Sequence, residues 1–485
     1  MLCLIRQHRW IFGGFTLAGL ALRLFFVVHF PAVTDDSRMY ADVGKNWLEH
    51  GIYGETQGGH PEKPILPTDS RLPGYPAFLA GIFWIFGAGN FRAVMLVQVL
   101  FDIGTCMIVA DLARRVVSTR TAKIAFALAT LCPFLANYTA AVLTETLEVF
   151  FTALALDFAV VALNRMHRGQ AHAFRLWAAT GGAIGACVLL RPDGGILLAV
   201  VVVYLVAAAA KATSESSDGA ASLKRRSFAA GIILVVVALA LGPWTIRNFH
   251  TFHQFQPLAP RYANEMDELV TSGFNRWVKT WIVDYVSVEE IYWNVSGDKI
   301  DGQKLPSRAF DNLEERDTTL ALIADYNESQ DMTAELDARF GELAADRVRA
   351  HPLRYYVVLP GLRIADMWLR PRTELLPPDP RWWEFHDAKK ESALAVGFGV
   401  LNLAYVGAAL WALVRGSSGI RWVGLLFGFL LLRSAFLGTL ENPEPRYTLE
   451  GYPVVIILAA GYLSDLSFLS SCLLNATKRK SESSI

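Results

Sequence analysis

The stretch "VTDDSRMYADVGKNWLEHG", residues 33–51, directly follows the first apolar run of the chain and carries two adjacent carboxylates. Its pattern predicts a helix that is capped by Asp35 or Asp36 and ends at Gly51. On such a helix Asp36 and Tyr40 share one face. Helix capping alone would explain the acids. A general base that deprotonates an acceptor hydroxyl or amine would also explain them.

The rest of the chain indicates that this stretch belongs to a membrane protein. Of its 485 residues, 53% are hydrophobic and only 19% are charged, and the mean hydropathy is +0.32. These values are too apolar for a soluble enzyme. Apolar runs long enough to cross a bilayer predict an all-α polytopic membrane protein with about ten transmembrane helices. The runs lie near residues 10–30, 91–113, 121–137, 139–162, 173–191, 193–211, 228–246, 392–414, 421–440 and 450–470.

The basic residues predict the orientation of these helices. With the N-terminus in the cytoplasm, every short Lys/Arg cluster falls on the cytoplasmic side, including those at 114–115 and 165–168. We therefore expect a multi-pass protein of the plasma (inner) membrane with both termini cytoplasmic. The first loop and the active site would then be external.

Two apolar stretches, residues 71–89 and 354–371, are too short or too charged to cross a bilayer. They predict external juxtamembrane helices. The expected organisation has three parts. These are an N-terminal transmembrane catalytic module at 1–246 that includes the external loop 31–90, an external and mostly helical region at 247–391, and C-terminal transmembrane helices with a cytoplasmic tail at 392–485.

Two charged residues stand out beyond the first loop. Glu145 lies near the outer end of an apolar run, where a carboxylate is costly and a functional role is the default expectation. Arg191 lies in a Pro/Gly turn two residues before Asp193. It either pins this turn through Asp193, or binds an anionic ligand, or orients a catalytic carboxylate.

Two more arginines are placed where an apolar run meets the outer surface. Arg247 and Asn248 follow one run, and Arg446 and Tyr447 lie in a Pro-rich hairpin between two others. Each arginine is either a simple interfacial anchor or a ligand for phosphate, which the planar guanidinium suits.

The sequence contains no nucleotide-binding glycine loop, no metalloprotease motif and no Cys/His cluster with metal spacing. We therefore expect no cofactor and no metal site, and leave a divalent cation open. The zero net charge argues against nucleic acid as a partner. External carboxylates and arginines would suit a lipid whose phosphate carries a sugar.

Several segments resemble one family in the same order along the chain. They are "DDSRMYADVGKNWLEHGIY", "RLPGYPAFLAGIFWIFG", "LTETL", "LLRPDGGILL", "GPWTIRNFHTF" and "EPRYTLEGYP". The chain resembles the polytopic glycosyltransferases of the C-type fold that use a polyprenyl-phosphate-linked sugar. Within them it is most similar to the protein O-mannosyltransferases and the lipid A aminoarabinose transferase. The likeness is weakest over residues 262–350.

The resemblance implies an inverting glycosyltransferase with Asp36 as general base. Many relatives have Asp-Glu where this chain has Asp36-Ser37, so Glu145 is the candidate for a second catalytic acid. Substrate binding is assigned to Tyr40, Arg191, Arg247, Asn248, Arg446 and Tyr447. The expected partners are the polyprenyl-phosphate-linked sugar, an acceptor protein, glycolipid or wall polymer, and membrane lipids.

The alternative function is a flippase or transporter of a lipid-linked saccharide. Such a protein would be expected to show inverted repeats and helices broken near the bilayer midplane. Neither is clear in the sequence.

Overall fold

A computed structural model describes residues 1–60, 62–170, 173–215, 219–262, 269–384, 388–415 and 420–466. Within it the chain divides into two compact units. Unit 1 comprises residues 1–261, 404–430 and 449–485, and unit 2 comprises residues 262–403 and 431–448.

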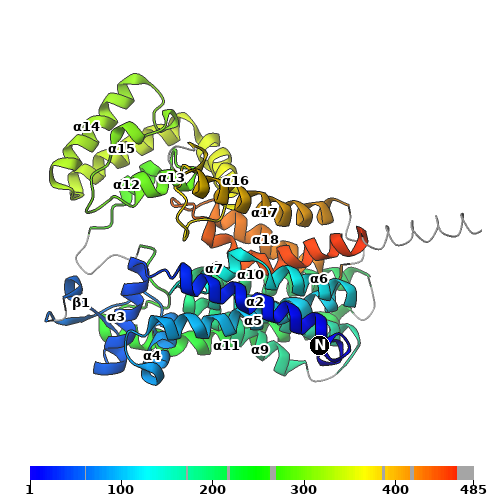
Figure 1. Cartoon of the computed structure of the whole chain (residues 1–485). Coiled ribbons are helices and arrows are strands. Elements are labelled where there is room, and N and C mark those ends of the chain that lie inside the picture. Colours follow the sequence, from blue (N-terminus) through cyan, green and yellow to red (C-terminus); the bar gives the residue numbers. More distant parts are fainter. Residues whose placement is uncertain are drawn as a thin grey trace, which may run out of the picture. The chain divides into compact units, whose positions relative to one another are not determined.

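Unit 1 is a helical bundle with one small two-stranded sheet (Figure 1). Its elements are α1 (Leu2–Gln7), α2 (Arg9–His29), α3 (Asp35–His50), β1 (Gly54–Thr56), β2 (Ile65–Pro67), α4 (Gly74–Phe86), α5 (Phe91–Val116), α6 (Thr119–Thr130), α7 (Pro133–Tyr138), α8 (Glu145–His167), α9 (Phe174–Leu190), α10 (Gly195–Glu215) and α11 (Gly219–Phe252).

Unit 2 contains shorter helices, and two longer ones are shared between the units. Its own helices are α12 (Ser272–Val278), α13 (Tyr285–Ser287), α14 (Leu313–Ser329), α15 (Ala334–Ala350) and α16 (Leu359–Leu369). The unit boundaries fall within α17 (Lys389–Val414) and α18 (Val423–Leu437).

Six helices of the described chain are long and apolar enough to cross a membrane. They are α2, α5, α8, residues 223–252 of α11, α17 and the helical segment Pro445–Leu466. Shorter apolar helices cover Gly74–Phe86, Phe174–Leu190, Pro192–Ala207 and Val423–Leu437. The mainly helical, multi-pass architecture is therefore confirmed, whereas the count of ten spans is not.

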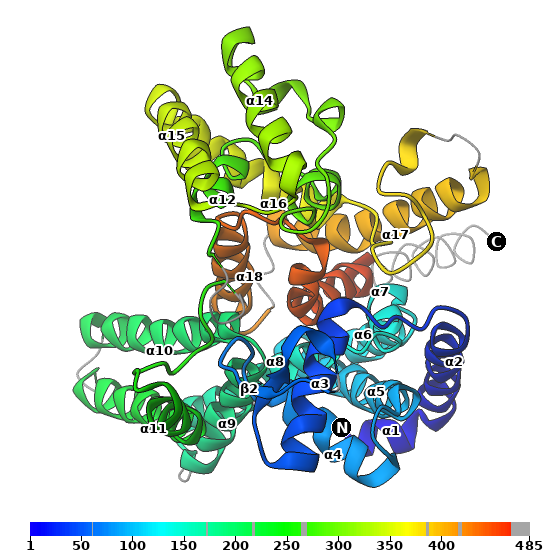
Figure 2. The same cartoon turned by 90° about the vertical axis from the view of Figure 1, so that its left-hand side faces the viewer.

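The bundle of unit 1 is built around α5, α8 and α9. Helix α5 packs on α6 and α8, α9 packs on α8 and α11, and α10 lies beside α11 (Figure 2). A buried ion pair between Arg23 and Asp102, 2.5 Å apart, joins α2 to α5. Arg23 also donates to the Thr130 carbonyl of α6 at 2.7 Å. Two opposite charges inside apolar helices are tolerated because they satisfy each other.

The first loop contains helices where the sequence predicted them, together with a β-hairpin that was not predicted. Strands β1 and β2 pair antiparallel, with Glu55 opposite Leu66. Asp42 of α3 fastens this hairpin, because its carboxylate accepts hydrogen bonds from the amide and the hydroxyl of Thr56 at 2.6 and 2.9 Å. The predicted juxtamembrane helix at 71–89 is α4, and that at 354–371 contains α16.

Unit 2 has a core of its own, and the predicted helical segment of the outer region forms α14 and α15, which lie side by side (Figure 1). Trp277 and Trp281 are fully buried in this core. Arg363 of α16 is fully buried as well and donates to the carbonyls of Ile282 and Gly438 at 2.8 and 3.2 Å.

Candidate functional site

The first turn of α3 carries both acids of the opening stretch, and neither of them caps it. The N-cap is Thr34, whose hydroxyl accepts from the Ser37 amide, while the Ser37 side chain accepts from the Thr34 amide. The prediction that Asp35 or Asp36 is the cap was therefore wrong, because a capping box already satisfies these orphan amides. The predicted end of the helix at Gly51 is confirmed by its left-handed φ of 69°.

The two acids have different surroundings. The Asp35 side chain is 93% exposed and pairs with Arg38 of the same helix at 2.8 Å. Asp36 faces Arg71, whose Nη2 lies 3.1 Å from the carboxylate. Arg71 comes from the segment before α4, so this contact closes the first loop on itself. The sequence analysis did not single out Arg71.

Arg71 retains one donor that no group in the described part of the chain accepts. Its Nε is buried and has no hydrogen-bond partner among the described residues. An unsatisfied buried donor is costly, so an acceptor oxygen from a ligand would be stabilised there. The guanidinium carbon also lies 5.7 Å from the centre of the Tyr40 ring.

Tyr40 lies at the centre of the predicted residues of unit 1. Its ring packs edge-on against Tyr75 of α4, with 5.1 Å between the ring centres. Burial raises the pKa of the Tyr40 phenol, the charges of Asp36 and Glu145 raise it further, and those of Arg71 and Arg191 lower it. The phenol therefore stays protonated and can donate a hydrogen bond, and four charged groups from separate segments act on one ring.

Arg247 holds the loop that presents Arg71. Its guanidinium donates to the carbonyl oxygens of Thr68 and Tyr53 at 2.7 and 2.6 Å. The Tyr53 hydroxyl in turn donates to the Arg71 carbonyl at 2.8 Å. Asn248 is fully buried, accepts from Arg247 at 2.9 Å and donates to the Gln256 carbonyl at 2.8 Å. The geometry thus gives Arg247 a positioning role that the sequence did not suggest.

A backbone contact joins the start of the first loop to the turn before α8. Ala32 forms a parallel bridge with Ala141, through its amide to the Ala140 carbonyl at 2.8 Å and its carbonyl to the Val142 amide at 3.2 Å. Asp36 and Glu145 each follow this bridge by four residues and each lie in the first turn of a helix. The bridge therefore brings the two helix N-termini into one neighbourhood.

The side chain of Gln98 on α5 supports the same turn. Its amide donates to the carbonyls of Thr139 and Ala141 at 3.2 and 2.7 Å, and its oxygen accepts from the Tyr75 hydroxyl at 2.8 Å. All these groups are buried, so the network replaces hydrogen bonds that water would otherwise make. It links α4, α5 and the turn that leads to Glu145.

Arg191 contacts two carboxylates. Its Nη1 lies 3.7 Å from Glu145, and its Nε lies 3.1 Å from Asp193. The contact with Asp193 that pins the turn and a contact with the Glu145 carboxylate are thus present together, whereas a catalytic role of Glu145 stays a prediction. Gly74 allows α4 to approach this place, because a Cβ there would lie 2.5 Å from the Leu189 carbonyl oxygen.

An apolar cavity of about 600 Å³ opens in unit 1 beside the first loop. Its lining includes Trp47, Tyr53, Pro243, Trp244 and Arg247. The cavity therefore combines a largely apolar wall with one guanidinium, and Tyr53 connects it through a single hydrogen bond to the backbone of Arg71.

The two remaining predicted residues belong to unit 2. Arg446 pairs with Glu444 through its Nε at 2.6 Å, and its guanidinium lies over the Tyr447 ring. The Tyr447 hydroxyl donates to the same carboxylate at 2.5 Å. Arg433, mid-helix in α18, donates to the Tyr447 carbonyl at 3.0 Å. These residues form a compact cluster of polar side chains around Glu444.

Metal-binding side chains do not gather in the described part of the chain: no three His, Cys, Asp or Glu residues there form a group that would hold an ion. The expectation about a cofactor or cation stays a prediction.

Comparison with known proteins supports the resemblance. Residues 63–242 match the family described as dolichyl-phosphate-mannose-protein mannosyltransferase. This segment includes Arg71, Glu145 and Arg191, while Asp36 and Arg247 lie outside it. No curated protein matches the sequence.

Solved structures match over most of the chain. The oligosaccharyltransferase of Archaeoglobus fulgidus in complex with Zn and sulfate is 15% identical, with a TM-score of 0.51 over 96% of this chain and 51% of its own. The archaeal oligosaccharyltransferase AglB from Archaeoglobus fulgidus, in complex with an inhibitory peptide and a dolichol-phosphate, is 15% identical. Its TM-score is 0.49, over 95% of this chain and 52% of its own. ArnT from Cupriavidus metallidurans bound to undecaprenyl phosphate is 15% identical. Its TM-score is 0.40, over 91% of this chain and 77% of its own.

The chain spans about half the length of the archaeal oligosaccharyltransferase, and at this identity the match speaks for the fold alone. The family match and the shared architecture agree with the ordered motifs of the sequence. The chain thus has the fold of the polytopic, C-type membrane glycosyltransferases.

Proposed function

We propose that this protein transfers a sugar from a polyprenyl-phosphate donor to an acceptor hydroxyl or amine, with Asp36 as the general base. The observation that carries the proposal is the arrangement of Asp36, Arg71 and Tyr40 at the mouth of the bundle. The family match supports a lipid-phosphate sugar donor.

The chemistry requires a base and a place for a leaving phosphate. The acceptor oxygen or nitrogen forms a bond to the anomeric carbon with inversion, its proton passes to Asp36, and the bond from that carbon to the phosphate oxygen breaks. The polyprenyl phosphate leaves with the electron pair. Asp36 does not serve as the helix cap, because Thr34 and Ser37 form the capping box. A base in hydrogen-bonding reach of its substrate contributes on the order of a hundredfold to ten-thousandfold in rate.

Arginine side chains would stabilise the charge that develops on the leaving phosphate. The buried Nε of Arg71 supplies one unused donor, and Arg191 brings a second guanidinium to the surroundings of Tyr40. Glu145 would orient Arg191 through their 3.7 Å contact. Because the guanidinium groups carry the positive charge, we propose that no cofactor is required. Chelation with EDTA tests a divalent cation.

The donor's lipid tail would occupy the apolar cavity beside the first loop. The cavity's aromatic wall suits a polyprenyl chain, and Arg247 in its lining holds the loop that presents Arg71 to the phosphate end. Arg446 and Tyr447 of unit 2 are proposed as further substrate contacts. We propose an external active site in the inner membrane, with both termini cytoplasmic, since the basic clusters lie at the opposite ends of α5 and α8 from this site. The acceptor would be a protein, a glycolipid or a wall polymer.

Reconstitution in liposomes tests the proposal. Purified protein is given polyprenyl phosphates carrying radiolabelled mannose, glucose or aminoarabinose, with membranes of a deletion strain as acceptor. We expect label to move from lipid to acceptor with wild-type protein and with Asp35→Asn, and no transfer with Asp36→Asn. Movement of intact lipid-linked sugar across the bilayer without cleavage would instead support a flippase. Mass spectrometry of lipid-linked sugars that accumulate in the deletion strain would identify the donor.

A further inference from the structure

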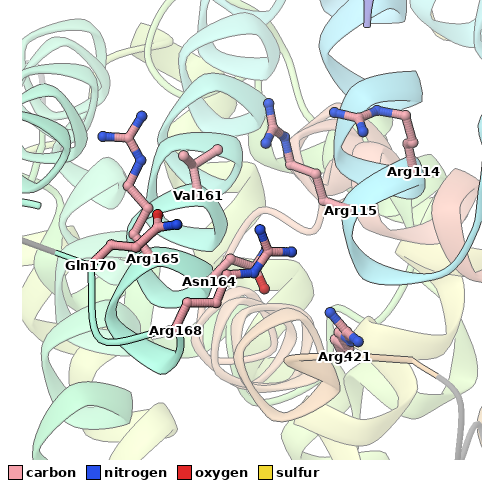
Figure 3. Close-up of a pocket in the computed structure, with 8 residues that line it drawn as sticks. All are labelled: Arg114, Arg115, Val161, Asn164, Arg165, Arg168, Gln170 and Arg421. Carbon is pink, nitrogen blue, oxygen red and sulfur yellow. The ribbon is translucent and has the colours of Figure 1, made fainter. Parts of the chain in front are cut away.

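A basic pocket of about 340 Å³ lies in unit 1, at the far end of α8 from Glu145 (Figure 3). Arginines from three chain segments line it: Arg114 and Arg115 near the end of α5, Arg165 and Arg168 at the end of α8, and Arg421 just before α18. The 20 residues between Glu145 and Arg165 correspond to about 30 Å along a helix. The pocket is therefore separate from the proposed donor site.

The pocket carries excess positive charge. Arg114 and Arg115 share Asp111 at 2.7 and 2.5 Å, and Arg115 also lies 3.1 Å from Asp157. The other three arginines have no carboxylate within ion-pair distance in the parts of the chain that the structure describes. Two carboxylates thus balance two of five guanidinium groups. Packing several unpaired cations around one space is unfavourable unless an anion enters it.

Specific contacts fix the three segments that build the pocket. The Arg421 amide donates to the Val116 carbonyl at the end of α5 at 2.8 Å. The Trp422 indole donates to the Asn164 side chain of α8 at 3.1 Å. The ion pair between Arg115 and Asp157 joins α5 to α8. These contacts therefore fix the relative positions of the three segments that carry the arginines.

We propose that this pocket is a binding site for a phosphate-bearing anion. The planar guanidinium group matches the geometry of phosphate. The volume of the pocket falls within the range of about 300–1,000 Å³ that small-molecule sites occupy. Helices α5 and α8 are candidate membrane spans, and the arginines in and beside their last turns would then lie near the lipid head groups. Basic pockets between spans on the cytoplasmic side bind anionic lipid head groups. The phosphate comes either from such a lipid or from a soluble phosphate compound.

The test compares two variants that each lose three positive charges. One is Arg165→Gln/Arg168→Gln/Arg421→Gln, within the pocket. The control is Arg6→Gln/Arg120→Gln/Arg175→Gln, whose exposed arginines do not line it. Native mass spectrometry in detergent measures binding of cardiolipin and of phosphatidylcholine. Thermal unfolding in detergent measures protection by inorganic pyrophosphate.

We expect wild type and the control to bind cardiolipin or pyrophosphate, and the pocket variant to bind it about tenfold more weakly or worse. Cardiolipin binding identifies a lipid source, and pyrophosphate protection identifies a soluble one. Equal weakening in both variants would overturn the proposal. So would a wild-type protein that binds cardiolipin no better than phosphatidylcholine and is not protected by pyrophosphate. If the triple variant does not fold, Arg168→Glu alone is compared with Arg175→Glu under the same criteria.

Discussion

The guanidinium of Arg71 and the carboxylate of Asp36 lie 3.1 Å apart, although 35 positions separate them in the chain. The contact joins the first turn of α3 to the segment before α4, and so closes the first loop over Tyr40. Arg247 and Tyr53 hold the Arg71 side of this contact by hydrogen bonds to backbone carbonyls. A base and a candidate phosphate ligand are thereby placed together before any substrate binds.

The paired acids allow a matched comparison. Asp36→Asn should lower transfer on the order of a hundredfold or more, because an amide cannot take the acceptor proton. Asp35→Asn should stay within about twofold of wild type, because this side chain is 93% exposed and exposed ion pairs contribute little. Turnover of lipid-linked sugar by the purified variants measures both. Normal turnover by Asp36→Asn would remove it as the base.

Arg71 should bind the phosphate of the sugar donor through the shape of its guanidinium group as well as through its charge. Arg71→Lys keeps the positive charge but loses the planar set of N–H donors that matches a phosphate. We therefore expect a raised KM for the lipid-linked sugar and a reduced kcat. Arg38→Lys, on the exposed side of α3, is the matched control and should change neither. An unchanged KM and kcat in Arg71→Lys would contradict a phosphate contact.

Arg247 should act through the first loop. Arg247→Lys loses hydrogen bonds to Tyr53 and Thr68, each typically contributing on the order of 1 kcal/mol. We expect faster amide hydrogen exchange across β1 and β2, together with slower transfer. A raised donor KM with unchanged exchange in the hairpin would instead show that Arg247 binds the phosphate directly.

The helix cap predicts a stability effect at Thr34. Thr34→Ala should lower the free energy of unfolding by about 1 kcal/mol, because the Ser37 amide loses its acceptor. Thr34→Ser keeps the hydroxyl and should be close to wild type. Thermal unfolding in detergent compares them, and an equal loss in both variants would rule out the cap as the cause.

Two glycines of α4 should respond in opposite ways to alanine. Gly74→Ala should destabilise the protein and lower transfer, because its Cβ would meet the Leu189 carbonyl at 2.5 Å, next to the Arg191 turn. Gly81→Ala meets nothing within 4 Å and should stabilise the helix by roughly 0.5–1 kcal/mol. Equal unfolding temperatures for the two variants would contradict the close approach.

Patterns of apolar residues were sufficient to predict a mainly helical, multi-pass protein, because a bilayer sets the length of a span, but the predicted count of ten spans is not confirmed. The end of α3 at Gly51 was predictable for a similar local reason. The cap was not, since Thr34 and Asp35 are both good N-caps and only the backbone decides between them. Asp36, Glu145 and the other assigned site residues stay predictions, although the Ala32–Ala141 bridge joins the segments that carry Asp36 and Glu145, and Arg191 contacts Glu145.

Arg71 was missed because its importance depends on a contact distant in sequence. It opens the segment "RLPGYP", whose prolines and aromatics drew attention to a juxtamembrane helix. Arg247 shows the converse: an arginine at the end of a span suggests a phosphate ligand, but carbonyl groups of the loop take up its donors. Which acceptor a guanidinium meets is a matter of tertiary structure.

The bridge between Ala32 and Ala141 aligns two segments that are distant in the sequence. The two segments leave the bridge in the same direction, and each reaches its acid, Asp36 or Glu145, after four residues. One residue inserted after Ala32 would lengthen the extended connection to α3 by about 3.3 Å and shift Asp36 relative to the bridge, while the connection to Glu145 would keep its length. The length of these two short connections, as much as the identity of the acids, is therefore under structural constraint.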